Sequence, residues 1–329
     1  MQRPTLRRMH TQLTELLEIE HPVMLAGMGG VSYHRVVAAV SEAGGFGCLG
    51  ASVMGHQEMV DEITATAAST QKPFGVDLLT AAPQDMAAKV ASIADGGATV
   101  FVAGLGVPSE VIDQCHERGL LVVNMCGKVA HAVAAVAAGC DIVVAQGTEA
   151  GGHTGQVATM ALVPQIVDAV GDRVPVVAAG GIVDGRGLVA ALSLGAAGIW
   201  VGTRFIATPE ARAVPGYKDG ILRGADDGTM ITRAYTGKTC RVLRTEYARE
   251  FERAGGAAEP FPGQVITSMN DGANHLGGDE HTEGVDPTRE FMPAGQGIGA
   301  IESLVPAGDL VRQFVAEAEV VMERVAALR

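Results

Sequence analysis

Short apolar segments rich in valine, isoleucine and leucine recur along the first 205 residues of the chain. Eight of them follow one another, at residues 23–28, 46–52, 74–79, 100–106, 121–127, 141–147, 175–181 and 198–205. None alternates cleanly between apolar and polar residues, and this is the pattern of strands that are buried on both faces. Parallel strands covered by helices are buried in this way. The pattern therefore predicts eight buried parallel strands.

Stretches with helical spacing of apolar residues lie between these strands. The expected helices cover residues 33–43, 57–68, 83–93, 109–117, 129–138 and 186–194. Eight alternating units are typical of a (β/α)8 TIM barrel closed on itself, whereas an open doubly wound sheet usually has fewer strands. We expect an α/β protein with the barrel fold, and the doubly wound sheet is the alternative.

The alternation of strand and helix breaks after residue 205. Residues 209–295 hold a stretch that we predict to be helical and partly basic, at 238–253, and then a polar, glycine-rich run at 270–289. Long insertions of this kind at a barrel mouth often act as lids. We therefore divide the chain into a barrel unit, residues 1–208 and 296–329 with an amphipathic C-terminal helix at 310–328, and a lid or cap at 209–295.

Composition and charge limit the partners of this chain. It has 329 residues, of which 47% are hydrophobic, and a formal net charge of −13. Binding to nucleic acid or to an anionic membrane requires a basic face, so we expect neither partner and look for small molecules. The amino end lacks an uninterrupted apolar segment, and no stretch of 18 apolar residues follows. We expect a soluble, cytoplasmic protein.

The cysteines and the acidic histidine-containing run do not indicate metal or disulfide chemistry. The five cysteines, an odd number, include no CxxC pair, and Cys48, Cys126 and Cys140 lie in or beside apolar runs where we expect small buried side chains. The spacing of His275, Asp279, Glu280 and His281 matches no ordinary zinc pattern. We predict no metal site and a solvated loop at this run.

Glycines gather where the strands end. They are Gly27, Gly50, Gly104, Gly127, Gly147, the pair Gly180 and Gly181, and Gly202 followed by Thr203. The loops after strands seven and eight form a phosphate site in many barrels, because free backbone N–H groups and a helix N-terminus point at the anion there. We predict a phosphate site at these two loops. A Rossmann phosphate loop is the weaker interpretation, since the third glycine spacing is absent.

Two further loops carry candidate chemistry. His153 stands among glycines in QGTEAGGHTG after the sixth strand, where an imidazole can accept or donate a proton near neutral pH. Met28 stands between Gly27 and Gly29 after the first strand. It could place a thioether against a flat aromatic ring, or the segment could be a simple tight turn.

Five segments together resemble one known family. They are PFGVDLL at 73–79, EAGGHTG at 149–155, AAGGIVDGRG at 178–187, VGTRF at 201–205 and AGQGIGAI at 294–301. In this order they are similar to the nitronate monooxygenase family, formerly 2-nitropropane dioxygenases, and to its relative the flavin-dependent enoyl-acyl-carrier-protein reductase. The resemblance covers nearly the whole chain and implies an FMN-dependent (β/α)8 barrel with a lid.

The resemblance also implies roles for individual residues. The loop of Gly27, Met28 and Gly29 would lie against the isoalloxazine, Gly151 and the catalytic His153 would border its reactive edge, and Gln296 would contact flavin or substrate. The backbones of Ala179, Gly180, Gly181, Gly202 and Thr203 would hold the FMN phosphate. Asp77 replaces the asparagine that is usual in the family, and a carboxylate can accept from flavin N3–H but has no amide hydrogen to donate.

Several functions fit this family resemblance. The first is oxidation of a nitronate or a similar small substrate, and the alternative is an oxidoreductase of an acyl thioester, either an enoyl reductase or a CoA-ester dehydrogenase of lipid or steroid breakdown. An NADH:quinone reductase is a further alternative, and His153 with a lid weighs against a flavin-binding protein without catalysis.

NADH or NADPH is a candidate reductant and a homodimer a candidate assembly. The basic stretch 238–253 could bind CoA or carrier phosphates, although a solvated helix face is favoured.

Overall fold

Eight parallel strands form a closed ring in the computed structural model, which describes residues 8–80, 84–104, 106 and 108–328. They are β1 (Val23–Leu25), β2 (Gly47–Gly50), β3 (Phe74–Leu79), β4 (Val100–Gly104), β5 (Leu121–Cys126), β6 (Ile142–Gln146), β8 (Val176–Ala179) and β9 (Gly198–Val201). Each strand pairs with the next, β9 pairs with β1, and a parallel bridge between Met24 and Phe46 joins β1 to the start of β2. The eight-stranded barrel is thereby confirmed, and the doubly wound sheet is excluded.

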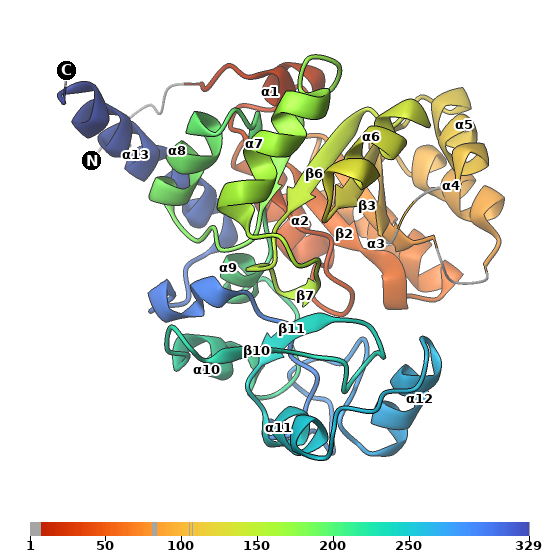
Figure 1. The fold of residues 1–329 in the computed structure, drawn as a ribbon. Coiled ribbons are helices and arrows are strands. Elements are labelled where there is room, and N and C mark those ends of the chain that lie inside the picture. The colour runs from red at the N-terminus through yellow and green to blue at the C-terminus, as the bar shows by residue number, and fades with distance from the viewer. Residues whose placement is uncertain (1–7, 81–83, 105, 107, 329) are drawn as a thin grey trace.

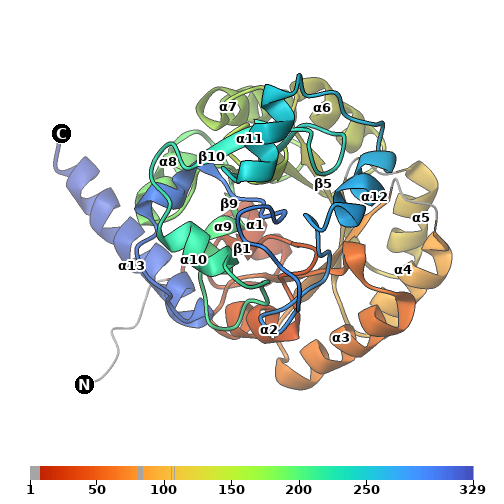
Figure 2. The same cartoon turned by 90° about the horizontal axis from the view of Figure 1, so that it is seen from below.

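Helices surround the ring of strands (Figures 1 and 2). They are α2 (His34–Glu42), α3 (His56–Ser69), α4 (Met86–Asp95), α5 (Ser109–Glu117), α6 (Val129–Ala137), α7 (Thr159–Val170) and α8 (Gly185–Ser193), with α1 (Gln12–Leu16) before the first strand. The C-terminal helix α13 (Ala307–Ala326) packs on α8 and α2. The predicted helix start at Pro83 and the strand residue Leu105 lie outside the described residues. No helix in the described ranges is long and apolar enough to cross a membrane.

The strands are buried on both faces, and this explains their lack of alternation. Met24, Val102 and Trp200 belong to a cluster that fills the inside of the ring, with exposed fractions of 5% or less. Val76 and Val143 belong to the layer between strands and helices, where both are fully buried. Because side chains fill the ring, a ligand has to bind at its mouth.

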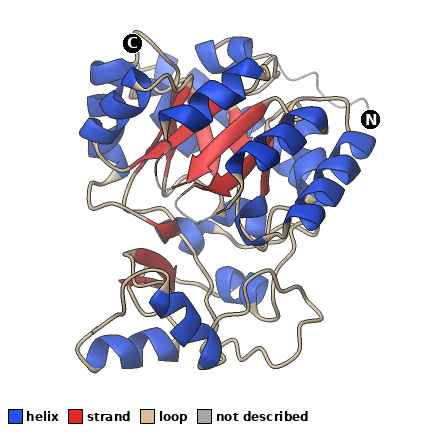
Figure 3. Ribbon diagram, turned by 90° about the vertical axis from the view of Figure 1, so that its right-hand side faces the viewer, coloured by secondary structure: helices blue, strands red, loops and turns tan. Residues whose placement is uncertain are grey.

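The inserted segment, residues 209–295, lies beyond the C-terminal ends of the strands (Figure 3). Between the short α9 (Thr203–Ile206) and the 3-10 helix η2 (Gln296–Ala300) the chain forms α10 (Tyr217–Leu222), β10 (Thr229–Thr232), β11 (Cys240–Leu243), α11 (Glu246–Arg253) and α12 (Gly263–Asn270). A second sheet joins β10, β11 and the two-residue strand β7 (Gly152–His153) of the barrel. The inserted segment is therefore hydrogen-bonded directly to the loop that carries His153.

The prediction of one helical stretch over 238–253 is wrong at its first half. Cys240–Leu243 is a strand paired on both sides, and the helix begins only at Glu246. Similarly, His153 was expected in a loop and lies in a short strand, where it pairs with Cys240. Pairing between distant segments overrides local periodicity at both places.

All five cysteines are free thiols in the buried interior. Burial raises the pKa of Cys126 and of Cys140 to about 12, and it raises the pKa of Cys48 well above its ordinary value. A thiol with such a pKa stays protonated near neutral pH and is a poor nucleophile. The three cysteines predicted to be small buried side chains are confirmed as such.

Candidate functional site

Two adjacent strand ends present backbone donors that have no protein partner. Gly180 and Gly181 follow β8, Gly202 and Thr203 follow β9, and the N–H groups of these four residues donate to no other described group. Gly180 and Gly181 have φ values of +107° and +72°, which only glycine adopts readily. The four residues are partly or fully exposed, whereas Ala179 is buried at 2% exposure. Free, accessible N–H groups from two neighbouring loops fit a phosphate group.

The AGQG segment closes the outer side of this phosphate cradle. The N–H of Gly295 donates to Thr203 Oγ1 at 2.9 Å, and the N–H of Gln296 donates to Glu149 O at 2.9 Å. Gly151 packs so tightly on this segment that a Cβ there would lie 2.7 Å from the backbone of Ala294. The side chain of Gln296 is exposed and, with Gly180 and Gly181, lines a cavity of about 370 Å³. Four segments that are distant in sequence thus meet at one place.

Glu149 holds this region together, and the sequence analysis did not identify its role. Its Oε2 accepts hydrogen bonds from the N–H of Thr159 at 2.7 Å and from Thr159 Oγ1 at 2.8 Å. Thr159 is the first residue of α7, and a carboxylate is favoured at a helix N-terminus. Glu149 therefore caps α7 and fixes the loop that leads to Gly151.

The loop after β1 packs on the ends of two other strands. A Cβ on Gly27 would lie 2.2 Å from the Cβ of Asp77, and a Cβ on Gly202 would lie 3.2 Å from Met28 Sδ. Met28 N–H donates to Ser32 Oγ at 2.6 Å, which fixes the turn. Gly29 is exposed at the edge of the site. The structure thus brings Gly27, Met28 and Asp77 together at the barrel mouth.

Asp77 is a buried carboxyl group without a hydrogen-bond partner among the described residues. It lies on β3, is 8% exposed, and its oxygens lie beside Gly27 and Gly104. Burial raises the pKa of Asp77 from 3.8 to about 8. The carboxyl is therefore mostly neutral at pH 7, and a neutral carboxyl has one O–H donor that the ionised form lacks.

His153 is held in place from both sides. Its Nε2 lies 3.0 Å from Thr236 Oγ1 of the inserted segment, and its carbonyl accepts from Gln146 Nε2 at 2.6 Å. Burial, together with the charge of Lys238, lowers the pKa of His153 to about 4. The imidazole is therefore neutral at pH 7, and its Nδ1 has no hydrogen bond within the described chain. Thr236 could not have been found from sequence, since it lies 83 residues from His153.

A cavity of about 930 Å³ opens beside His153. Its walls come from the ends of β5 and β6, from α6, and from residues 233–239 of the inserted segment. Polar and charged lining residues include Asn124, Lys128, His131, Gln146, His153, Arg233 and Lys238. Its size is near the upper end for ligand pockets in proteins.

The basic stretch 238–253 separates into residues with different surroundings. Lys238 lines the cavity, whereas Arg241 is buried and donates from Nε to Thr148 O at 2.9 Å and from Nη1 to Thr229 Oγ1 at 3.2 Å. Arg244 pairs with Asp227 at 3.3 Å. Arg249 is exposed on α11, as expected for a solvated helix face. Only the first residue of the stretch is placed to meet a ligand.

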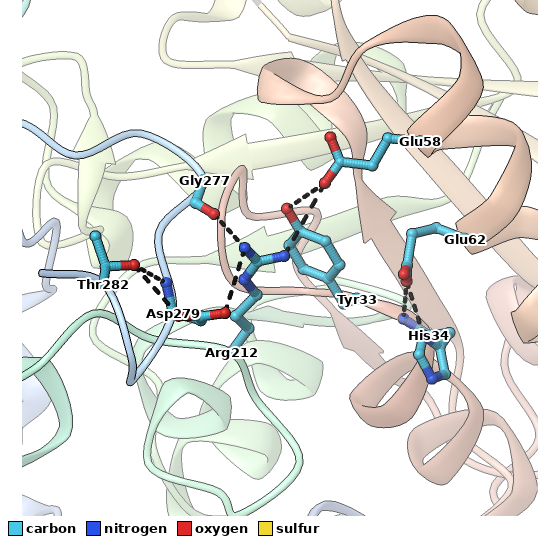
Figure 4. Close-up of polar contacts among 8 residues, drawn as sticks. All are labelled: Tyr33, His34, Glu58, Glu62, Arg212, Gly277, Asp279 and Thr282. Atoms are coloured by element: carbon cyan, nitrogen blue, oxygen red, sulfur yellow. Dashed lines mark hydrogen bonds and ion pairs between the residues drawn. The ribbon is translucent and has the colours of Figure 1, made fainter.

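The polar run of the inserted segment lies against the loop after β1 (Figure 4). Arg212 Nη2 donates to Gly277 O at 2.6 Å and lies 3.7 Å from Asp279 Oδ2, while its Nη1 is 4.0 Å from Glu58 Oε1 on α3. The N–H of Arg212 donates to Val31 O at 3.0 Å. This run, which has no clear counterpart in the family motifs, is thus attached beside Met28.

The histidine-containing part of this run takes part in other contacts. His275 Nδ1 lies 2.6 Å from Glu290 Oε2, and Asp279 pairs with Arg212. Within residues 8–80, 84–104, 106 and 108–328, no three histidine, cysteine or acidic side chains are grouped so that they could hold a metal ion.

Free backbone donors, a half-buried histidine and a large cavity at one end of a (β/α)8 ring are features of a barrel enzyme. A model of the nitronate monooxygenase family matches residues 10–317 of the chain. The chain belongs to this family, and the resemblance seen in the sequence motifs is confirmed.

Known relatives include enzymes of two kinds. The (3aS,4S,5R,7aS)-5-hydroxy-7a-methyl-1-oxo-octahydro-1H-indene-4-carboxyl-CoA dehydrogenase of Mycobacterium tuberculosis is 42% identical over 255 residues, which are 77% of this chain and 71% of the relative. A probable nitronate monooxygenase of Staphylococcus aureus is 30% identical over 318 residues, covering 82% and 89%. The solved structure of FabK from Thermotoga maritima has a TM-score of 0.87 at 33% identity and covers 98% of this chain and 100% of FabK. The expectation of an oxidoreductase is confirmed.

Proposed function

We propose that the chain is an FMN-dependent oxidoreductase that acts on an acyl thioester. The FMN phosphate would bind to the free N–H groups of Gly180, Gly181, Gly202 and Thr203. Their number, their accessibility and the two positive φ values support this assignment. Bound FMN would supply an acceptor or donor of hydride at the barrel mouth.

The residues around the mouth would hold the flavin ring. Gly27, Met28 and Gly29 offer backbone and a thioether, and the neutral carboxyl of Asp77 offers an O–H donor. Gly151 and Gln296 lie on the segments that close the phosphate cradle, and the buried Ala179 packs beneath it. The inserted segment would act as a lid, because β11 and β7 join it to the loop of His153.

The cavity beside His153 is the observation that carries the choice of a thioester. At about 930 Å³ it exceeds the needs of a small nitronate, and it continues from His153 to α6 and to the inserted segment. A long acyl thioester would occupy this space. The relative from M. tuberculosis, whose name describes a CoA ester, is more similar in sequence than the nitronate monooxygenase of S. aureus.

His153 would move the proton that accompanies hydride transfer. Oxidation of an acyl thioester removes a proton next to the carbonyl and a hydride from the adjacent carbon, and reduction of an enoyl thioester reverses both steps. The neutral imidazole has Nδ1 available, while Thr236 fixes the ring through Nε2. Such a base or acid typically contributes 10²–10⁴-fold to a rate.

The test begins with the absorption spectrum of the purified protein and the identity of the flavin released on denaturation. Saturated and enoyl CoA esters, the latter with NADH or NADPH, are then added without oxygen, and flavin bleaching or NAD(P)H oxidation is followed. We expect FMN and turnover of a thioester. A colourless protein that does not take up FMN, or one that turns over no thioester, contradicts the proposal.

Nitronate oxidation is the second candidate, and the similarity to the S. aureus enzyme over 82% of this chain favours it. Oxygen uptake with propyl-nitronate tests it, and NADH oxidation with benzoquinone tests quinone reduction. A homodimer and a cytoplasmic location stay predictions, which gel filtration and cell fractionation would check.

A further inference from the structure

We propose that Lys128, Arg233 and Lys238 form a binding site for the diphosphate group of a nucleotide. Such a group occurs in a CoA thioester and in NADH or NADPH. The choice between these two sources rests on the proposed oxidoreductase function, whereas the anion site rests on the cations themselves. The anion site can therefore be tested separately from the proposed reaction, and either one can be refuted without the other.

The three cations come from opposite walls of the cavity beside His153. Lys128 precedes α6 at the end of β5 and is exposed, whereas Arg233 and Lys238 come from the turn of the inserted segment. The N–H groups of Val129 and Ala130, in the first turn of α6, donate to no described group. Cations that converge on one cavity match the oxygens of a diphosphate, and these helix donors directly follow Lys128 in the chain.

The turn between β10 and β11 is built so that its cations reach the cavity. Arg233 Nε donates to Gly237 O at 2.8 Å, and Gly237 has a φ of +75°. A Cβ on Gly237 would lie 2.2 Å from Glu259 O, so the turn requires glycine there. Lys238 Nζ lies 4.7 Å from the ring centre of Phe261, and no described carboxylate forms an ion pair with it.

None of these three cations forms an ion pair with a described carboxylate. Arg212 and Arg244 do form such pairs. The chain has a net charge of −13, so carboxylates are abundant. A group of like charges without counter-charges raises the local potential and attracts an anion from solution.

A buried donor in the same cavity also lacks an acceptor. Asn124 on β5 lines the cavity, is 4% exposed, and its Nδ2 has no hydrogen-bond partner in the part of the chain that the structure describes. An unsatisfied buried donor is unfavourable, and a ligand that supplies acceptor oxygens to this cavity would reduce that cost. Asn124 thus points independently to an oxygen-rich ligand.

Calorimetry on the full chain with FMN bound tests the site, with ADP as the diphosphate probe and adenosine as the uncharged reference. We expect ADP to bind, adenosine to bind at least tenfold more weakly, and Lys128→Ala and Arg233→Met each to weaken ADP binding about tenfold, the effect of one lost charge-assisted hydrogen bond. Arg233→Lys keeps the charge and should recover much of the affinity. Arg249→Ala removes an exposed charge from α11 and serves as the matched control.

The same variants show whether the bound diphosphate belongs to a CoA thioester or to NADH or NADPH. If CoA is the source, the KM for a CoA thioester rises in Lys128→Ala while that for the matching N-acetylcysteamine thioester does not. If a dinucleotide is the source, the KM for NADH or NADPH rises instead. Equal binding of ADP and adenosine, or equal weakening by Arg249→Ala, overturns the site. Cation-dependent ADP binding without thioester turnover keeps the site and refutes the proposed reaction.

Discussion

The guanidinium of Arg212 lies 4.4 Å from the centre of the Tyr33 ring, and the hydroxyl of Tyr33 donates to Glu58 at 3.1 Å. Together with the hydrogen bond to Gly277, this contact ties the inserted segment to the barrel beside the loop of Met28 (Figure 4). Replacing Arg212 by methionine should lower the free energy of unfolding by about 2 kcal/mol, because a cation–π contact and a charge-assisted hydrogen bond are lost.

The same Arg212→Met variant should also bind FMN more weakly, because the Met28 loop loses its outer support. Fluorescence titration of FMN measures this effect, and chemical denaturation measures the loss of stability. Arg223→Met is the matched control, since the Arg223 side chain is 83% exposed on the inserted segment and its ion pair among the described residues is with Asp219 of the adjoining α10. Equal FMN affinity in the Arg212 variant and wild type would show that the contact supports only the inserted segment.

The strands could be predicted from sequence because burial on two faces requires a continuous apolar segment at each strand. Each of the eight apolar segments contains a strand of the ring. Likewise the glycine pair at 180–181 could be recognised in the sequence as a special turn, because its positive φ values exclude most other residues. Local patterns therefore predicted the barrel and the position of the two glycines with free backbone donors, whereas phosphate binding there stays a prediction.

Features that depend on contacts between distant segments could not be read in this way. The strand Gly152–His153 has no apolar pattern and exists because Cys240 and Arg241 pair with it. The charged residues interleaved in 238–253 have helical spacing, yet the first of them lie on a turn and a strand. Thr236, which orients His153, and Lys128, which faces the same cavity from the barrel, carry no local signal at all.

The glycine pair after β8 gives a test of the phosphate cradle. Alanine at position 181 would be strained at a φ of +72°, and relaxation would turn its N–H away from the cradle. We expect Gly181→Ala to weaken FMN binding about tenfold, the effect of one hydrogen bond to a charged group. Gly97→Ala is the control, because Gly97 has a φ of +88° and no neighbouring atom within 4 Å of an added Cβ. Should both variants bind FMN like wild type, the cradle is misassigned.

His153 is expected to act in catalysis and not in cofactor binding. His153→Gln should reduce kcat by 10²–10⁴-fold while FMN content and absorption spectrum stay unchanged. Thr236→Val keeps the imidazole but removes the partner of its Nε2, so we expect a smaller loss of about tenfold for a misoriented ring. Rates from rapid mixing with the best thioester would separate the two variants. A His153→Gln enzyme with wild-type kcat rules out the proton-transfer role.

The charge of Lys238 should influence the pH below which the reaction slows, because it affects the pKa of His153. Its charge disfavours the imidazolium and is one cause of the lowered pKa of His153, about 4. In Lys238→Met the pKa should rise, and the acid limb of kcat/KM should move to higher pH; burial, the larger cause, keeps it below 6.5. An N-acetylcysteamine thioester is the suitable substrate, because it has no phosphates for Lys238 to bind. Lys128→Met, tested in parallel, should leave the acid limb in place.

Asp77 should make the flavin-free protein less stable as pH rises. Its pKa is about 8 in the folded protein and 3.8 without burial, so between these values the folded chain holds a proton that the unfolded chain has released. The contribution of Asp77 to the free energy of unfolding is therefore largest below pH 4, and it decreases progressively as the pH rises to about 8. Asp77→Asn removes this dependence. The variant should therefore unfold like wild type near pH 4 and be more stable by several kcal/mol at pH 8, since each pH unit between two pKa values corresponds to about 1.4 kcal/mol. Urea unfolding at both pH values measures the difference, and parallel stability curves for the two proteins would mean that Asp77 is ionised in the folded state.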